Sequence, residues 1–102
     1  MKTGVTVIAY IFARAGEENR VRNALLALVK QTRKEKGCIN YDLHHSTNDA
    51  RTFVMYENWE SAEDLEAHAK SQHLREFGRI MGPSLERPTE LTKWNMLSNP
   101  TH

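Results

Sequence analysis

Residues 56–73, YENWESAEDLEAHAKSQH, join the end of a predicted strand to a predicted helix and carry the side chains best suited to chemistry. The apolar residues 53–56 are typical of a strand, and Ser61 followed by Asp64 matches a helix N-cap with an acidic residue in the first turn. If this strand and helix pack against each other, their polar and aromatic side chains converge on one small volume. These side chains are Tyr56, Asn58, Trp59, His68 and His73.

The sequence on either side of this stretch alternates between strand and helix patterns. Apolar residues at helical spacing predict one helix over residues 17–36, ended by Gly37, and another over residues 61–82, which restarts at Ser71. Residues rich in β-branched and aromatic side chains predict strands at 5–13, 38–45, 51–58 and 90–97.

The order β-α-β-β-α-β predicts a ferredoxin-like α+β fold, in which a four-stranded antiparallel sheet carries two helices on one face. Residues 1–102 fit a single domain, and residues 98–102 are expected to form a flexible tail. The first strand is apolar on both faces, although the helices cover only one. A second copy is therefore expected to cover the other face, giving a homodimer packed sheet on sheet.

Composition excludes several classes of protein. The formal net charge is +1, with 14 basic and 13 acidic residues in no long block, which argues against nucleic-acid or membrane partners. No apolar run approaches the roughly 20 residues that a membrane helix requires, and no secretory leader pattern occurs. The single cysteine, Cys38, fits a reducing compartment, so a cytoplasmic location is expected.

Several short motifs together resemble the antibiotic biosynthesis monooxygenase (ABM) domains, and the likeness covers nearly the whole chain. They are Ala15-Gly16-Glu17, Glu35-x-Gly37-Cys38 with Tyr41, Tyr56-Glu57-x-Trp59-Glu60-Ser61, Leu65-x-Ala67-His68 and Ser71-Gln72-His73. The resemblance implies a dimeric α+β barrel and an activity like that of the small quinol monooxygenases. Family members often have Thr-Pro-His where this chain has Ser71-Gln72-His73. The haem-degrading branch is disfavoured, because His68 and Arg79 stand where that branch has a tryptophan and a histidine.

The motifs for common cofactors do not occur. The sequence has no Gly-rich phosphate loop, no dinucleotide fingerprint and no Cys or His group at zinc spacing. His44 and His45 point to opposite faces of a strand, and His68 and His73 lie five residues apart across a helix restart, so neither pair is expected to hold a metal. A cofactor-independent monooxygenase is therefore predicted, acting with molecular oxygen on a quinol, an anthrone-like compound or another polyphenol. Once deprotonated, such a substrate itself gives an electron to oxygen.

This chemistry needs an apolar pocket for a flat ring, a base and hydrogen-bond donors for an oxyanion. The predicted catalytic base is His68 or His73, because histidine titrates near neutral pH. The predicted substrate pocket contains Tyr56, Asn58, Trp59, Phe77 and Trp94, of which Asn58, Tyr56 or Trp94 would donate to the oxyanion.

Each of these residues also has a structural interpretation. A histidine on a helix is often a satisfied structural residue, Trp59 fits a core anchor at the strand-to-helix corner, and Asn58 fits a turn stabiliser. Glu57 and Glu60 fit solvated side chains or ion pairs at a dimer edge, and Cys38 fits a small core residue.

Two other functions stay open on the sequence. One is an isomerase or lyase that uses the same base on a small dicarbonyl or sugar-phosphate-like compound without oxygen. The other is a non-catalytic dimeric protein that binds a ligand or responds to stress, because one fold hosts many functions.

Overall fold

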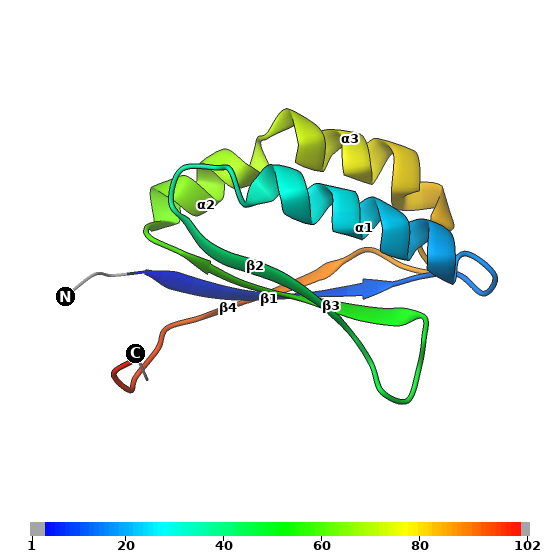
Figure 1. The fold of residues 1–102 in the computed structure, drawn as a ribbon, viewed down its shortest axis with the longest axis horizontal. Helices are drawn as coiled ribbons and strands as arrows, with labels where there is room; N and C mark the ends of the chain where they lie inside the picture. Colours follow the sequence, from blue (N-terminus) through cyan, green and yellow to red (C-terminus); the bar gives the residue numbers. More distant parts are fainter. Residues whose placement is uncertain (1–3, 101–102) are drawn as a thin grey trace.

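The computed structural model describes residues 4–100 and confirms the predicted ferredoxin-like α+β fold (Figure 1). The strands are β1 (Val5–Phe12), β2 (Cys38–His45), β3 (Thr52–Trp59) and β4 (Glu90–Trp94). The helices are α1 (Glu18–Thr32), α2 (Ala62–Ala69) and α3 (Gln72–Met81), followed by the short 3-10 helix η1 (Gly82–Ser84). No helix among residues 4–100 is long and apolar enough to cross a membrane.

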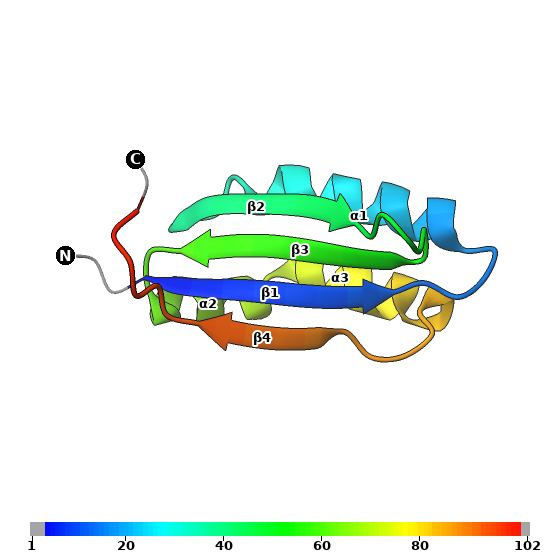
Figure 2. The ribbon, with the colours of Figure 1, turned by 90° about the horizontal axis from the view of Figure 1, so that it is seen from below.

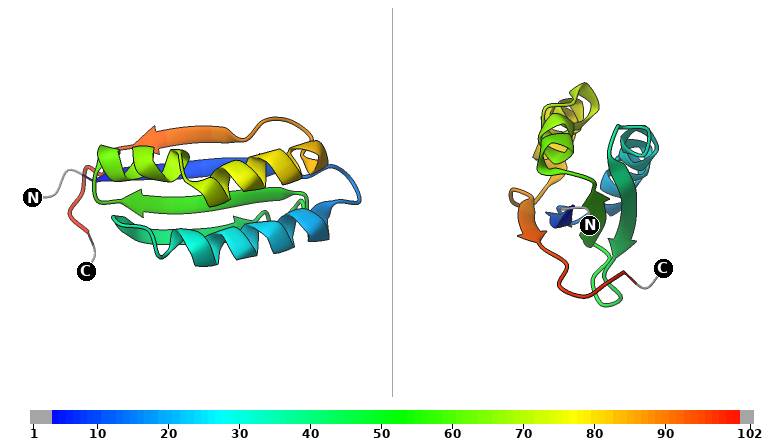
Figure 3. Two further views of the ribbon diagram at one scale, coloured as in Figure 1. Left: turned by 90° about the horizontal axis from the view of Figure 1, so that it is seen from above. Right: turned by 90° about the vertical axis from the view of Figure 1, so that its left-hand side faces the viewer.

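The four strands form one antiparallel sheet in the order β2-β3-β1-β4 (Figure 2). All the helices lie on one face of this sheet, with α1 over the β2 side and α2 and α3 over the β4 side (Figure 3). No helix covers the other face of the sheet, which we call the open face. The face toward the helices is called the covered face.

The hydrophobic core lies on the covered face. Along β1, Val7, Ala9 and Ile11 are buried, whereas their neighbours Ile8 and Tyr10 are half-buried on the open face. This alternation follows from the period of a β-strand, whose successive side chains point to opposite faces. The rest of the core comes from the facing strands and helices: Ala13, Val21, Leu25, Leu28, Val29, Tyr41, Phe53, Met55, Trp59 and Met81.

The predicted helix ends are present in the structure. The Ser61 hydroxyl accepts a hydrogen bond from the Asp64 backbone N–H, and the Ser71 hydroxyl accepts one from the Leu74 N–H, so each serine caps its helix. Gly37 has φ of 82°, and a Cβ there would lie 2.1 Å from an Asp64 carboxylate oxygen. Glycine is therefore required in the tight turn between α1 and β2.

Two strand predictions differ from the structure. The last strand ends at Trp94 rather than at residue 97, and no regular element follows it up to residue 100. A bulge at the start of β2 places Cys38 opposite Trp59, toward the core, and leaves Ile39 exposed. Strict alternation would have put Cys38 on the open face. The extra residue of the bulge inverts the alternation locally and turns Cys38 toward the core. The tail prediction falls partly on residues 101–102, which lie outside the described residues.

Candidate active site

An apolar cavity of about 460 Å³ lies between the covered face and the helices. Its walls are mostly aliphatic and come from all four strands and from α1, α2 and α3. Its mouth lies between α2–α3 and β4, because the exposed lining residues Ala69, Gly78, Leu91 and Lys93 belong to these elements. Three buried polar side chains line the interior, Tyr41, Glu57 and His68, and three exposed ones, Glu66, Thr89 and Lys93, lie at the rim. Drug-sized ligands commonly bind in pockets of this size and character.

The imidazole of His68 is buried and tightly held. It packs against Trp59, with ring centroids 4.7 Å apart, and edge-on against Tyr41, with centroids 5.3 Å apart. Its Nδ1 lies 2.9 Å from Glu35 Oε2, and within residues 4–100 the side chain makes no second hydrogen bond. Because a carboxylate only accepts hydrogen bonds, the Nδ1 atom carries the proton, and in the neutral ring Nε2 is then the basic atom.

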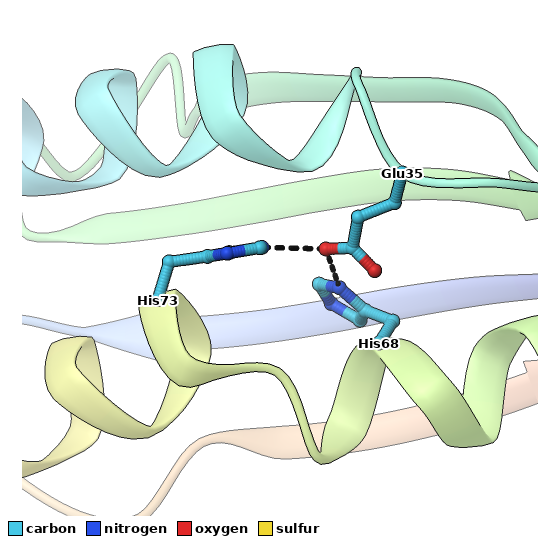
Figure 4. Close-up of side chains that lie close together, drawn as sticks. All are labelled: Glu35, His68 and His73. Carbon is cyan, nitrogen blue, oxygen red and sulfur yellow. Dashed lines mark hydrogen bonds and ion pairs between the residues drawn. The ribbon is translucent and has the colours of Figure 1, made fainter.

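Glu35 also joins the second histidine. His73 Nε2 lies 2.5 Å from the same Oε2 atom, so one carboxylate oxygen serves two imidazoles. Figure 4 shows the three side chains converging from the loop after α1, from α2 and from the start of α3. The expected helix restart between the two histidines is present, because α2 ends at Ala69 and Ser71 caps α3. It does not keep the two rings apart, because the turn at Ser71 brings both of them to one carboxylate.

Glu35 is not among the site residues predicted from the sequence. It lies 33 residues from His68 and 38 from His73 in the chain, so no local pattern connects them. The available signal was the Glu35-x-Gly37 match within the family resemblance. The Gly37 turn directs the chain past the α2 N-terminus and so positions Glu35 near both rings.

Glu57 is the second titratable group of the cavity. Its side chain is almost fully buried, and it accepts a hydrogen bond from Trp59 Nε1 at 2.9 Å. Burial raises the pKa of the Glu57 carboxyl to about 7; the indole hydrogen bond opposes this rise, and the charge of Glu35 adds to it. The expectation that Glu57 is solvated or paired at a dimer edge is therefore wrong. Its position between buried Met55 and Trp59 on alternate residues was the signal for burial.

Two further groups near the cavity are held in their neutral forms. Burial, reinforced by the charge of Glu57, raises the pKa of the Tyr41 hydroxyl. Burial also raises the pKa of the Cys38 thiol to about 11, with Glu35 and Glu57 adding to the rise. A thiol that resists ionisation is a poor nucleophile, which agrees with the reading of Cys38 as a packing residue.

Three of the predicted pocket residues do not join the histidines. Tyr56, Asn58 and Trp94 lie on the open face, where Thr6 pairs with both Asn58 and Trp94 across the sheet. Asn58 donates to Asn40 at 2.9 Å and accepts from Thr6 Oγ1, so its side chain is part of a sheet network. The expected convergence of all five residues named from the strand-to-helix stretch is wrong, because Tyr56 and Asn58 alternate with Glu57 and Trp59 along β3.

The remaining two predicted pocket residues lie on the covered face. Trp59 is fully buried in the core, where it supports both His68 and Glu57. Phe77 lines the cavity from α3. The covered face therefore joins an apolar cavity, an imidazole held by a carboxylate, and a second carboxyl group whose pKa lies near neutrality.

Comparisons with known proteins agree with this architecture. Residues 4–79 match the family described as Antibiotic biosynthesis monooxygenase. The chain is 34% identical over 92 residues to “Putative monooxygenase Rv0793” of Mycobacterium tuberculosis, with 90% of each chain covered. It is 31% identical over 93 residues to “Probable quinol monooxygenase YgiN” of Escherichia coli, covering 80% of this chain and 89% of that protein.

Solved structures give the same result. The crystal structure of PA3566 from Pseudomonas aeruginosa superimposes with a TM-score of 0.90 at 34% identity, covering 96% of this chain and 98% of that one. The structure of Rv0793 superimposes with a TM-score of 0.89 at 30% identity, covering 97% and 100%. The chain therefore belongs to the antibiotic biosynthesis monooxygenase family, and at the level of that family its activity is that of a monooxygenase.

Proposed function

We propose that the protein is a cofactor-independent monooxygenase that oxidises a quinol, anthrone-like or polyphenolic substrate in the covered-face cavity. The observation that carries this proposal is the position of His68 and Glu57 on the wall of one apolar cavity of about 460 Å³. The printed name of a relative, “Probable quinol monooxygenase YgiN”, supports the substrate class. The aliphatic walls suit a flat ring, and the two titratable groups suit proton transfer at its hydroxyl.

His68 is the proposed base. Glu35 accepts a hydrogen bond from the protonated Nδ1, which leaves Nε2 as the basic atom to take the proton of the substrate hydroxyl. Contact with Trp59 and Tyr41 restricts rotation of the ring, so the base does not need to be ordered when substrate binds. Glu35 acts as a positioning residue, because it determines which imidazole nitrogen is basic.

Deprotonation makes the substrate able to reduce oxygen. The anion passes one electron to O₂, and the radical pair then combines to form a carbon–oxygen bond at a ring carbon. Cleavage of the O–O bond leaves one oxygen atom on the product and releases the other as water. For a naphthohydroquinone the balance is one quinol and one O₂ giving one hydroxynaphthoquinone and one water. Glu57, with a pKa near 7, is the proposed proton donor to the departing oxygen.

Oxygen uptake with 1,4-naphthohydroquinone tests the proposal. Spontaneous oxidation is subtracted, and ¹⁸O₂ should place one labelled atom in the hydroxyquinone and the other in water. His68→Asn should lower kcat by at least about 100-fold, the usual contribution of a general base. His44→Asn is the matched control, because His44 is exposed on β2 at the open face. Equal uptake by wild type and His68→Asn, with the fold retained in circular dichroism, would contradict the proposal.

A second variant tests the cavity without altering a titratable group. Gly78 lines the cavity, and a Cβ built there has no neighbour within 4 Å. Gly78→Trp should therefore fill the space near the mouth and raise KM strongly while the protein stays folded. Gly78→Ala is the size control and should leave KM close to the wild-type value. An unchanged KM in Gly78→Trp would show that substrate does not bind in this cavity.

An oxygen-independent isomerase or lyase is the second candidate, because an imidazole and a carboxyl group on one cavity wall also suit proton transfer between carbons. Exchange of substrate C–H protons with deuterium oxide under anaerobic conditions would favour this candidate. Oxygen consumption matched one to one with hydroxylated product would reject it. Tight binding of the aromatic ligand with neither reaction would favour a non-catalytic binding protein.

The proposal includes a homodimer joined through the open faces. Ile8, Tyr10 and Phe12 on β1, with Trp94 on β4, leave apolar surface on that side of the sheet. A sandwich of two such sheets would bury it. Sedimentation should give a dimer that Ile8→Asp converts to monomer. Leu26→Asp, at an exposed position on α1, should leave the dimer intact. A wild-type monomer at micromolar concentration would reject this arrangement.

The proposed site of action is the cytoplasm. Cys38 is the chain's only cysteine, and a half-buried thiol with a raised pKa is consistent with a reducing compartment. Fractionation of cells that express the chain with a C-terminal epitope tests this location.

A further inference from the structure

Glu35, His68 and His73 form the one cluster of three metal-ligating side chains among residues 4–100. One atom from each, a carboxylate oxygen and two imidazole nitrogens, lies within 4.8 Å of the others. Each residue comes from a different segment: the turn after α1, the last turn of α2 and the first turn of α3 (Figure 4). The convergence of these segments is a property of the tertiary fold.

The donor set suits a divalent transition-metal ion. Two neutral imidazoles and one carboxylate are typical ligands of zinc, and they leave a coordination position for water. Two ligands at about 2.1 Å from a tetrahedral ion lie about 3.4 Å apart. The present donor atoms therefore need only small side-chain rotations to surround an ion. Calcium and magnesium, which prefer oxygen ligands throughout, fit this set poorly.

An ion can reach the cluster from solvent. His73 lines a surface hollow between α1 and α3, together with Gln31, Gln72 and Glu76. The side chains of His73 and Glu35 are 21% and 16% exposed, whereas that of His68 is 5% exposed and lines the internal cavity. The cluster thus lies between the surface hollow and the covered-face cavity, with the more exposed ligands Glu35 and His73 on the side of the hollow.

We propose that Glu35, His68 and His73 form a binding site for a divalent transition-metal ion, and that the bound ion inhibits the reaction in the cavity. The inhibition rests on the proposed function of His68 as base. A metal ion bound to Nδ1 takes the place of the proton on that atom. The single N–H proton of the neutral imidazole is then on Nε2. The atom that faces the reaction is then a hydrogen-bond donor instead of a base.

Metal binding is tested without substrate, so that its outcome is independent of the oxidation. The full chain, freed of metal with a chelator, is titrated with Zn²⁺ by calorimetry and with Co²⁺ by visible absorption. One ion should bind per chain, with Kd below about 10 μM. His73→Asn and Glu35→Gln should each weaken binding at least 10-fold, within the range of a lost ligand or orienting partner. His44→Asn, at an exposed histidine far from the cluster, is the matched control.

Equal Zn²⁺ affinity in wild type, His73→Asn and Glu35→Gln would overturn the site. Glu35→Gln retains the shape of the side chain, so it keeps the test valid if His73→Asn does not fold. Zn²⁺ should also abolish the oxygen uptake of the wild type, and a chelator should restore it. Uptake that persists with the site saturated would overturn the inhibition but not the site. The oxidation proposal has a separate test. It fails if His68→Asn retains full oxygen uptake in the absence of metal.

Discussion

The same strands contribute side chains to two different environments, one on each face of the sheet. On the covered face, Glu57 and Trp59 are buried beside His68 at the cavity. On the open face, their neighbours Tyr56 and Asn58 lie beside Thr6 and Trp94, half in solvent. Four successive residues of β3 thus alternate between a site where burial changes acid–base behaviour and a surface that no helix of the chain covers.

This difference shows that burial, more than residue type, decides which polar groups are candidates for chemistry. Glu57 and Asn58 are both polar and adjacent, yet only the Glu57 side chain is removed from water. Burial shifts its pKa to about 7, a value suited to proton transfer at neutral pH. Asn58 is hydrogen-bonded within the sheet and faces away from the cavity.

The two tryptophans give the largest contrast between the faces. Trp59→Ala should lower the free energy of unfolding by about 3–5 kcal/mol, because it leaves a cavity in the core and removes the donor to Glu57. Trp94→Ala removes a side chain that is 53% exposed and should lower it by less than about 1 kcal/mol. Urea unfolding followed by far-UV circular dichroism measures both. If both variants lost the same free energy of unfolding at low protein concentration, the expected difference between the covered and open faces would be refuted. A Trp94 effect that grows with protein concentration would support a dimer through the open face.

The pH dependence of stability tests whether burial on the covered face raises the pKa of Glu57. Its pKa rises from 4.5 to about 7 on folding, so between these values the folded state binds more protons than the unfolded state. The stabilisation that the raised Glu57 pKa adds to the free energy of unfolding is fully present below pH 4.5 and is lost as pH rises through 7. The loss is about 3 kcal/mol for a shift of about 2.5 units. Glu57→Gln should remove this dependence.

Urea midpoints of wild type and Glu57→Gln, measured from pH 4 to pH 8, test this expectation. Glu90→Gln is the matched control, because Glu90 is an exposed carboxyl on the open face. Its curve should run parallel to that of the wild type. Parallel curves for wild type and Glu57→Gln would instead show that the cavity leaves this carboxyl well solvated.

A smaller effect is expected from the hydrogen-bond network of the open face. Asn58→Ala removes the bonds to Thr6 and Asn40 and should lower the free energy of unfolding by about 1 kcal/mol, because water replaces partners at a half-exposed site. A double-mutant cycle with Thr6→Val isolates the bond between them. The same variant should leave kcat of the oxidation near the wild-type value, and a 100-fold loss would show that the open face takes part in catalysis.

The smallest effect is expected at the ion pair between Arg33 and Asp42. The charged atoms lie 2.7 Å apart, but the two side chains are 56% and 41% exposed. Asp42→Asn should therefore change the free energy of unfolding by no more than about 1 kcal/mol. Thermal unfolding at low salt and at 1 M salt measures this difference, which should shrink as salt screens the pair. A loss that persists at high salt would show that Asp42 acts through its bond to Asn40 instead.

The sequence by itself determined the local features of this protein. Helical spacing, the caps at Ser61 and Ser71, and Gly37 after the first helix predict the element order, because each depends on residues within a few positions of one another. The same local patterns identified His68, His73, Trp59 and Phe77, which all lie on the covered face. The end of β4 and the bulge in β2 were missed, because both depend on pairing with neighbouring strands.

Only the tertiary structure decided which groups act together. Glu35 meets two histidines more than 30 residues away in the chain, and Glu57 acquires its raised pKa from the helices that pack over it. Alternation along β3 predicts that Glu57 and Asn58 point to opposite faces of the sheet. Because β1 is apolar on both faces, the sequence pattern does not predict which face the helices cover. Packing makes that choice, and with it decides which polar side chains are removed from water and have their pKa values shifted.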